Sequence, residues 1–384
     1  MTTALFWLAL TTLLIYLIVA VDLLRGNRSV RFLSDISNDL PSPAPKVSVI
    51  VAARNEARNI REALSSLLQL DYPDYELIVV DDRSEDATGA IVDELASDDP
   101  RLQAVHVAEL PPDWLGKNHA LWMGSRIATG ELLLFTDADI IMEPTILSRS
   151  VTFLREQRID HLAMTPVMRM PSLFLAMFGA SFIIFFSLFA RPWKARDPKS
   201  PCHIGIGAFN LITADAYRTI GGHETIRLRP DDDMKLGKIV KKGGFKQDII
   251  YGRGFLEVEW YASVREVING LEKNAFSGTD YRVGYALCGV LFYLLCGVWP
   301  WLALVMTTGA TQILNGAVVL IIILIFADTA RFHDARSWHA VGFPLCAGFF
   351  SWIIVRTLVL NLVQGGITWR GTFYRLSELK KNRM

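Results

Sequence analysis

Long apolar runs lie near both ends of this chain, and the region between them has shorter patterns of hydrophobic and polar residues. Four runs are almost free of charge and are long enough, or nearly so, to cross a bilayer; they are 4–24, 283–306, 313–327 and 341–363. The first has no basic start and no small-residue cleavage site, so we expect a retained anchor and not a signal peptide. Arg25, Arg28 and Arg31 follow it directly, and basic residues beside a span favour the cytoplasmic side.

A fifth apolar run, 173–190, lies inside the central region. A crossing there would put the two halves of one domain on opposite faces of the membrane. We therefore expect an interfacial segment over 171–196, with a hydrophobic core helix as the alternative. Three crossings after residue 280 would also place the basic C-terminal tail outside, against the positive-inside tendency. One of those runs is then re-entrant or folds as two pieces at its proline, and the pattern leaves this open.

The central region follows the pattern of alternating strands and helices. Short apolar runs predict strands at 47–52, 76–80, 102–107 and 131–135, and helical spacing predicts helices at 59–69, 88–96 and 118–128. Such alternation is typical of a parallel, doubly wound α/β sheet. The proline-rich stretch 41–45 precedes it as a stiff linker.

Polar residues follow three of these strands where each one ends. The first strand runs into Ala53-Arg54-Asn55-Glu56, the second into Asp81-Asp82-Arg83-Ser84 and the last into Thr136-Asp137-Ala138-Asp139. Ligands of open α/β sheets bind beyond the carboxyl ends of the strands. Carboxylates crowded at that edge need a cation or hydrogen-bond donors beside them, and oxygen ligands suit Mg²⁺ or Mn²⁺. The pattern predicts a site for a phosphate-bearing ligand with a divalent metal.

Composition narrows the class of protein. Of 384 residues, 51% are hydrophobic and the mean hydropathy is +0.30, which favours a membrane protein. Lys plus Arg and Asp plus Glu balance at 39 each, so the charge gives no reason to expect nucleic acid as a partner. The four cysteines show neither metal-ligand spacing nor a disulfide framework. The glycine fingerprints of dinucleotide and P-loop sites do not occur, which argues against those two classes.

Four motifs follow one another in the central region; they are Val49-Ile50-Val51-Ala52-Ala53-Arg54-Asn55-Glu56, Tyr75-Glu76-Leu77-Ile78-Val79-Val80-Asp81-Asp82-Arg83-Ser84, Gly116-Lys117-Asn118-His119-Ala120-Leu121 and Thr136-Asp137-Ala138-Asp139. In this order they resemble family 2 glycosyltransferases with the GT-A fold, in a membrane-attached form. The resemblance covers roughly residues 46–280, and the membrane layout is similar to ceramide glucosyltransferases, hopene-associated glycosyltransferases and bacterial carotenoid glycosyltransferases. It implies a mostly parallel α/β sheet with transmembrane helices attached.

The resemblance also implies roles for residues on the donor side. Asp137 would contact the nucleotide ribose or the metal, and Asp139 would bind the metal that bridges the donor diphosphate. The nucleotide-sugar pocket would further use Ala53, Glu56, Asp81, Asp82 and Lys117. Mg²⁺ or Mn²⁺ would be the cofactor.

Downstream, Asp231-Asp232-Asp233 precedes a helical pattern and resembles the acidic pair of the family. The alignment makes Asp232 and Asp233 that pair and Asp233 the general base, since an acceptor hydroxyl is a poor nucleophile until a carboxylate takes its proton. Acidic residues also cap helices, and a capping role is compatible with a catalytic one. On the acceptor side the resemblance implies roles for Gly205, Gly207 and Lys273.

One departure limits the assignment. Processive relatives carry a Gln/Arg-x-x-Arg-Trp element after the base, whereas 264–274 has no Arg-Trp pair and only Gly270, Lys273 and Asn274 to fill its place. We expect a non-processive, inverting transfer of sugar from a UDP- or GDP-linked donor to a lipid or isoprenoid acceptor. Transfer to polyprenyl phosphate and a scaffold that binds nucleotide sugar without turnover are the alternatives. The sugar, the base, the acceptor and the oligomeric state stay open.

The expected organisation is an anchor, a juxtamembrane linker, a cytoplasmic catalytic domain, a second membrane region and a basic tail. Their boundaries are 1–24, 25–45, 46–280, 281–366 and 367–384. The whole would be a multi-pass protein of the cell inner membrane.

Overall fold

The computed structural model describes residues 2–40 and 42–382 and divides into two compact units. One unit comprises 1–29, 169–191 and 260–384, and the other comprises 30–168 and 192–259. Pro41 of the expected linker and Arg383 of the expected basic tail lie outside the described residues.

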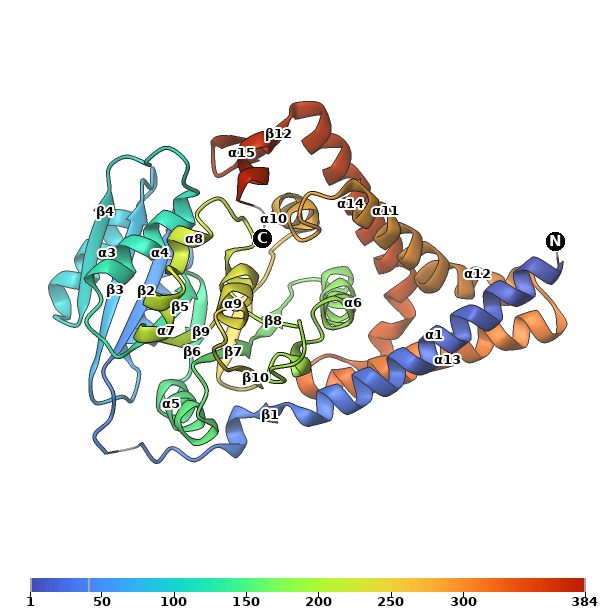
Figure 1. Ribbon diagram of the computed structural model, residues 1–384, viewed down its shortest axis with the longest axis horizontal. Coiled ribbons are helices and arrows are strands. Elements are labelled where there is room, and N and C mark those ends of the chain that lie inside the picture. The colour runs from blue at the N-terminus through green and yellow to red at the C-terminus, as the bar shows by residue number, and fades with distance from the viewer. Residues whose placement is uncertain (1, 41, 383–384) are drawn as a thin grey trace. The chain divides into compact units, whose positions relative to one another are not determined.

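The unit of 30–168 and 192–259 is an α/β fold built on one large sheet (Figure 1). The large sheet has eight strands in the order β1-β10-β7-β9-β5-β2-β3-β4, and a small sheet has the order β6-β11-β8. The strands are β1 Arg31–Phe32, β2 Val47–Ala53, β3 Tyr75–Asp82, β4 Leu102–Val107, β5 Leu132–Asp137, β6 Ile140–Met142, β7 His161–Thr165, β8 Val167–Arg169, β9 Asn210–Thr213, β10 Gln247–Tyr251 and β11 Leu256–Glu259. The helices are α2 Ile60–Leu68, α3 Thr88–Asp98, α4 Gly116–Ile127, α5 Ile146–Gln157, α7 Ala214–Thr219, α8 Gly222–Thr225 and α9 Asp232–Lys242, with 3-10 turns at Leu33–Asp35 and Pro192–Lys194.

The predicted α/β fold is confirmed, and the predicted strands and helices lie within a few residues of β2 to β5 and α2 to α4. Strand β2 pairs in parallel with both β3 and β5. Strand β9 is antiparallel to its neighbours β5 and β7. The other pairings in this sheet are parallel, so the sheet is mostly parallel. Val49, Ile50 and Val51 in the middle of β2 are fully buried, because helices cover this part of the sheet.

The other unit is helical apart from one hairpin. Its helices are α1 Thr2–Ser29, α6 Leu173–Ala190, α10 Val264–Ser277, α11 Val283–Phe292, α12 Trp299–Met306, α13 Gly309–His333, α14 Phe343–Gln364 and α15 Leu376–Lys381. Tyr293–Val298 is a π-helix between α11 and α12, Ser337–Gly342 is a 3-10 helix, and β12 Gly366–Trp369 pairs with β13 Thr372–Arg375. Within the described residues, five helical segments are long and apolar enough to cross a membrane; they are 3–29, 173–194, 283–306, 309–333 and 337–364.

The segment 283–306 is interrupted where the sequence has Pro300. A proline has no N–H to donate to the carbonyl four residues earlier, so the carbonyl of Cys296 loses its helical partner. Tyr16 of α1 supplies a replacement, since its hydroxyl donates to the Cys296 carbonyl over 3.1 Å. The chain forms a π-helix, Tyr293–Val298, directly before the turn that contains Pro300.

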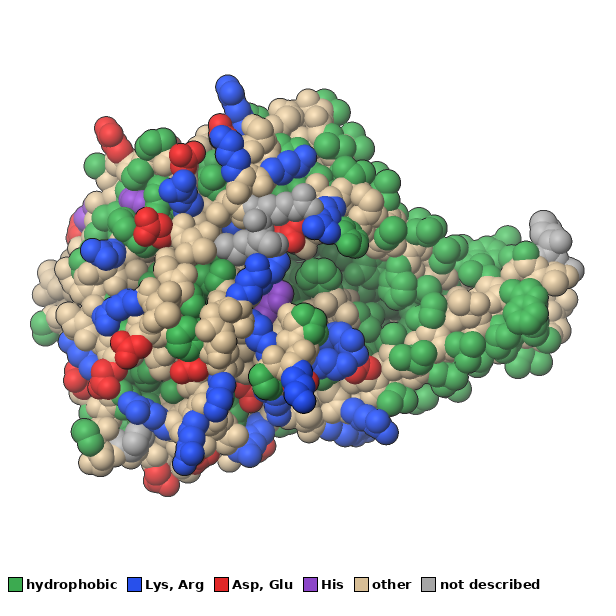
Figure 2. All heavy atoms as spheres, viewed as in Figure 1, with side chains coloured by type: hydrophobic (Ala, Val, Ile, Leu, Met, Phe, Trp, Pro, Cys, Tyr) green, Lys and Arg blue, Asp and Glu red, His purple; other side chains and the backbone are tan. Residues whose placement is uncertain are grey.

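Two arginines of the apolar helices, Arg28 and Arg356, have acidic partners. Arg28 forms two hydrogen bonds with Asp328, of 2.6 and 3.2 Å, which join α1 to α13. The pair gives a partner to Asp328, which lies just beyond the predicted end of this run at residue 327. Arg356 lies 2.5 Å from Glu272 of α10, so it faces a partner within the helical unit. Outward-facing side chains of these helices are mainly hydrophobic, as Figure 2 shows over α1 and α12.

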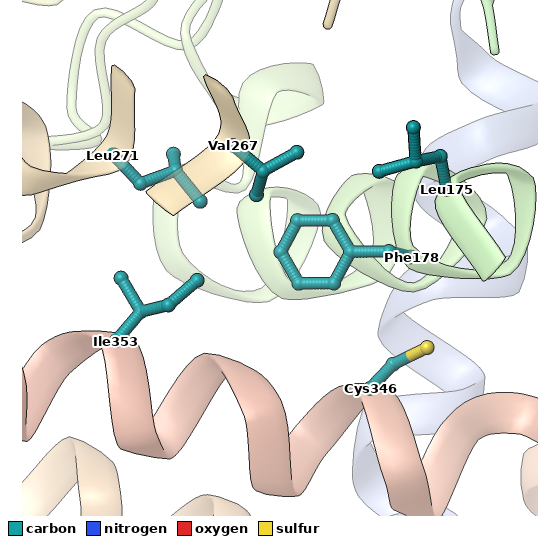
Figure 3. Packing of buried hydrophobic residues seen from close by; sticks show 6 residues of the cluster. All are labelled: Leu175, Phe178, Val267, Leu271, Cys346 and Ile353. Carbon is teal, nitrogen blue, oxygen red and sulfur yellow. The ribbon is translucent and has the colours of Figure 1, made fainter. Parts of the chain in front are cut away.

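Helices α6, α10 and α14 meet in a hydrophobic cluster (Figure 3). The six side chains point toward one another and come in pairs from the three helices; they are Leu175, Phe178, Val267, Leu271, Cys346 and Ile353. Because burial of apolar surface is the main favourable term in packing, this cluster fixes α6 within the helical unit.

Candidate functional site

The polar ends of β2, β3 and β5 lie at one edge of the large sheet, as predicted. The strand register pairs Ala52 with Asp137 and Ala53 with Asp81. Parallel pairing of neighbouring strands therefore brings the three polar segments together, although more than fifty residues separate Asp81 from Asp137 in the sequence.

The loops after β2 and β3 are joined to each other by hydrogen bonds. Asn55 has a left-handed backbone, with φ of 53°, and its side-chain oxygen accepts from the N–H of Glu85 over 2.8 Å. The N–H of Asn55 donates to the Ser84 hydroxyl (3.0 Å), and the N–H of Glu56 donates to the Thr88 hydroxyl (2.8 Å). The segment that carries Ala53 and Glu56 is thus held against the neighbouring loop before any ligand binds.

Asp81 and Asp82 are both buried but have different partners. Asp81 accepts from the N–H of Ser84 and lies 3.2 Å from the ring nitrogen Nδ1 of His106. Asp82 accepts from two nitrogens of Arg83, at 2.8 and 3.1 Å, and lies 3.7 Å from Arg54. Gly116, the first residue of α4, packs against the Asp82 carboxylate so closely that a Cβ there would be 2.0 Å from its oxygen.

Lys117, in the first turn of α4, joins two of the acidic segments. Its ammonium lies 2.7 Å from Asp137 and 3.3 Å from Asp232. Burial alone would lower the pKa of Lys117, but the charges of Asp137, Asp232 and Asp233 outweigh it and raise the pKa. The ammonium is therefore a permanent positive charge between the end of β5 and the start of α9. Lys117, Asp137 and Asp232 line a small cavity with Asn210 and His223.

Asp139 lies two residues beyond Asp137 in the turn that follows β5. Burial raises the pKa of Asp139 to about 7, and the negative charges of Asp137 and Glu56 add to the effect. A carboxylate so placed gains from a nearby cation. In 2–40 and 42–382, no three His, Cys, Asp or Glu side chains come together as a metal site. Two carboxylates with open positions for ligand oxygens and water suit Mg²⁺ or Mn²⁺, which seldom has an all-protein cage.

The acidic triplet begins α9, and its three members have separate partners. Asp231, at the N-cap position, makes no capping hydrogen bond with its side chain. It pairs instead with Arg229, which is fully buried, and lies 3.4 Å from Lys235. Asp232 faces Lys117, as described above. Arg229 and Asp231 therefore form an ion pair inside the fold, directly before the two predicted catalytic residues.

Asp233 is oriented by two backbone N–H groups. Its Oδ2 accepts from Gly207 over 3.0 Å, and its Oδ1 accepts from Met234 over 2.7 Å. Burial raises the pKa of Asp233 to about 7, with a further contribution from Asp232, while Lys117 acts in the opposite direction. A carboxylate of this kind is suited to accept a proton near neutral pH.

The predicted glycine loop packs directly on α9. A Cβ on Gly205 would lie 1.9 Å from the backbone oxygen of Asp233, and a Cβ on Gly207 would lie 2.6 Å from the carboxylate of Asp137. Glycine is required at Gly205 because only a residue without a side chain allows the two backbones this approach. Lys273 belongs to the helical unit, where its ammonium lies 4.5 Å from the centre of the Trp369 ring. Its acceptor-side role stays a prediction.

Two histidines near the site, His203 and His223, have hydrogen-bond partners within the protein. The Nδ1 of His223 is 2.8 Å from the Tyr217 hydroxyl, and burial lowers the pKa of His223 to about 3. The Nδ1 of His203 is 3.2 Å from the carbonyl of Pro201.

Three buried amides near these groups make contacts that the sequence does not predict, although Asn118 lies in one of the four motifs. Asn118 donates from its side chain to the carbonyls of Ile226 and Arg229, which ties α4 to the segment before α9. Asn210 accepts from the N–H of Ile206, and Gln247 accepts from the N–H of Ile204. An amide that bonds backbone groups distant in sequence has no characteristic spacing, so only the fold reveals it.

The family model described as "Glycosyl transferase family 2" matches residues 48–221. The 4,4'-diaponeurosporenoate glycosyltransferase of Staphylococcus haemolyticus (strain JCSC1435) is 24% identical over 65% of this chain and 66% of its own length. The enzyme of the same name from Staphylococcus aureus (strain MRSA252) is 21% identical over 86% of this chain and 89% of its own.

Among solved structures, a mannosyltransferase from Pyrobaculum calidifontis in complex with GDP-Man and Mn²⁺ has a similar fold. The TM-score is 0.54 at 19% identity, over 94% of this chain and 99% of that one. The family model and the curated relatives lead to one conclusion: residues 48–221 form a domain similar to glycosyl transferase family 2, and the protein is a glycosyltransferase.

Proposed function

We propose that this protein transfers a sugar, with inversion and without processivity, from a nucleotide-diphosphate sugar to a lipid acceptor at the membrane surface. The observation that carries the proposal is the position of Asp233. Its carboxylate is held by the N–H of Gly207, and it belongs to the same group of charges as Lys117 and Asp137. A single base beside a donor site favours one direct displacement, and one displacement inverts the anomeric carbon.

Each group then has a role in the transfer. The edge formed by Ala53, Glu56, Asp81 and Asp82 binds the nucleoside, and the Lys117 ammonium lies near the diphosphate. Asp139, with Asp137, would hold Mg²⁺ or Mn²⁺, which neutralises charge on the diphosphate leaving group. Asp233 takes the proton of an acceptor hydroxyl as the new bond forms. Asp232 keeps Lys117 in place through their 3.3 Å contact.

The acceptor class rests on the apolar helices and on the relatives. Five helical segments could hold the protein in a bilayer, where a lipid acceptor is found. The two relatives are named for glycosylation of a carotenoid acid, which supports an isoprenoid acceptor here. Arg25, Arg28 and Arg31 after the first span favour a cytoplasmic catalytic unit in a multi-pass inner-membrane protein.

The test is a transfer assay on membranes that contain the full-length protein. They are incubated with labelled UDP- and GDP-linked sugars and Mn²⁺, and the labelled lipid is identified by mass spectrometry. We expect one donor to label one lipid class, and labelling to be lost with Asp139→Ala. If no donor is transferred or hydrolysed, the proposed activity is wrong.

A second arm of the assay tests the role of Asp233. Asp233→Asn should bind nucleotide as the wild type does but fail to glycosylate a hydroxyl acceptor. An acceptor that is already an anion, such as a polyprenyl phosphate, needs no strong base. Full activity of the variant would therefore contradict the base assignment and favour such an acceptor.

A further inference from the structure

The orientation of Asp233 depends on a loop, residues 204–208, that lies along the first turns of α9. Two contacts show how close the two backbones are. A Cβ on Gly205 would lie 1.9 Å from the carbonyl oxygen of Asp233, and a Cβ on Gly237 would lie 1.8 Å from the carbonyl oxygen of Ile204. At these two glycines the backbone of the loop lies directly against the backbone of the helix.

One buried side chain bonds both partners of this contact. Gln247, the first residue of β10, is 1% exposed. Its side-chain oxygen accepts from the N–H of Ile204 over 2.7 Å, and its side-chain nitrogen donates to the carbonyl of Gly237 over 2.9 Å. One amide thus joins the start of the loop to the second turn of α9.

The same loop bonds Asp233 at its other end, through the N–H of Gly207. Between the two ends, the N–H of Ile206 donates to Asn210 and the carbonyl of Ala208 accepts from the Thr136 hydroxyl. These two bonds hold the loop to β9 and β5. Of the bonds described, only those of Gln247 and Gly207 hold the loop to α9.

We propose that Gln247 is a positioning residue for Asp233, acting through the 204–208 loop. The proposal rests on the proposed function, because it takes Asp233 as the base. Gln247 has no role of its own in the chemistry. Its amide fixes the distance between the loop and α9, and that distance determines whether the N–H of Gly207 can hold the carboxylate in the direction the transfer needs.

Gln247→Met tests the proposal, because it keeps the side-chain length and removes both hydrogen bonds. We expect kcat for transfer to fall about 10- to 100-fold, the size of effect that a displacement of about 1 Å can cause. The nucleotide dissociation constant should change less than about threefold, since Asp137, Asp139 and Lys117 are not bonded to Gln247. Hydrogen exchange should become faster at the amides of 204–207.

Ser48→Ala is a matched control. Ser48 is fully buried near the start of β2, at the opposite end of the strand from the site. Its hydroxyl donates to Glu76 and accepts from the N–H of Gly130, so the variant also loses two buried hydrogen bonds. A loss of stability alone would affect both variants similarly. We expect Ser48→Ala to keep the wild-type kcat and the wild-type exchange at 204–207.

The outcomes separate this inference from the proposed function. If Asp233→Asn is inactive while Gln247→Met matches Ser48→Ala in kcat, Gln247 is not a positioning residue. If Asp233→Asn is fully active, the base assignment itself fails. Should Gln247→Met not fold, Gln247→Glu replaces it, because the acid keeps the acceptor for Ile204 and, when ionised, loses the donor to Gly237. Wild-type kcat in that variant would also overturn the proposal.

Discussion

At the scale of single residues, the candidate site places the Lys117 ammonium among three carboxylates, those of Asp137, Asp232 and Asp233. Lys117 contacts Asp137 and Asp232 directly, and Asp233 contributes to its raised pKa. A buried charge without a counterion is costly, so each of these groups depends on the others. The residues proposed to bind substrate are therefore also residues that stabilise one another.

We predict that Lys117→Met weakens nucleotide binding at least tenfold. The variant removes a cation that contacts both Asp137 and Asp232, and hydrogen bonds to charged groups are worth about 1.5–3 kcal/mol each. Lys117→Arg keeps the charge and should recover part of the affinity. Calorimetric titration with the preferred nucleotide diphosphate measures the effect. Equal affinity of the wild type and Lys117→Met would place the phosphates elsewhere.

The pKa of Asp233 predicts how the rate depends on pH. The base must be ionised, and burial and Asp232 raise its pKa to about 7. Transfer should therefore fall about tenfold per pH unit below that value and level off above it. The profile of kcat/KM between pH 5 and 9 measures this. A flat profile across that range would exclude Asp233 as the base.

The stability of the folded protein should change with pH in the opposite direction to the transfer rate. The pKa of Asp233 is higher in the folded protein than its value of 3.8 in the unfolded chain, so its protonated form favours folding. This contribution is complete below pH 3.8 and is lost as the pH rises through about 7. Asp233→Asn removes the unfavourable ionisation. We expect its Tm to exceed that of the wild type at pH 8, with the difference shrinking toward pH 5. A lower Tm at pH 8 would contradict the assigned direction of the pKa shift.

At the scale of elements, the sequence predicted the strand ends of the candidate site better than the packing of the loop 204–208 on α9. Short apolar runs ending in Asp81-Asp82 and in Asp137 identify strand ends, because parallel pairing puts such ends at one edge. The contact between Asp233 and the loop 204–208 could not be predicted from the sequence. It depends on the antiparallel strand β9 and on Gln247 in β10, and neither has a distinctive pattern.

The contact between α9 and the loop gives a prediction at this scale. Gly237→Ala should reduce transfer at least tenfold, because the new methyl group would lie 1.8 Å from the Ile204 carbonyl and must push the helix away. Helix propensity alone would make the same change favourable by about 1 kcal/mol. Gly289→Ala in α11 is the control, since no atom outside its own helix turn lies within 4 Å. Similar activity in both variants would refute the packing argument.

At the scale of the whole molecule, chain connectivity constrains how α6 meets the membrane. Strand β7 precedes α6 and strand β9 follows it, and the two are hydrogen-bonded neighbours, with Leu162 opposite Leu211. Both ends of α6 must therefore return to one sheet. By length and hydropathy the segment 173–194 could cross a bilayer, yet a single crossing would separate paired strands. We infer that α6 enters and leaves at the same face.

Cysteine labelling of the full-length protein tests this inference. Gln157 at the end of α5 and Lys199 after α6 are both exposed, and each is replaced by cysteine after the four native cysteines are changed to serine. In sealed inside-out vesicles, an impermeant maleimide should label both positions, and in right-side-out vesicles it should label neither, because the two residues share one aqueous compartment. Opposite labelling of the two positions would mean that α6 crosses the bilayer. The sheet order, in which β7 pairs with β9, would then be wrong as well, so the outcome bears on the fold and the membrane arrangement together.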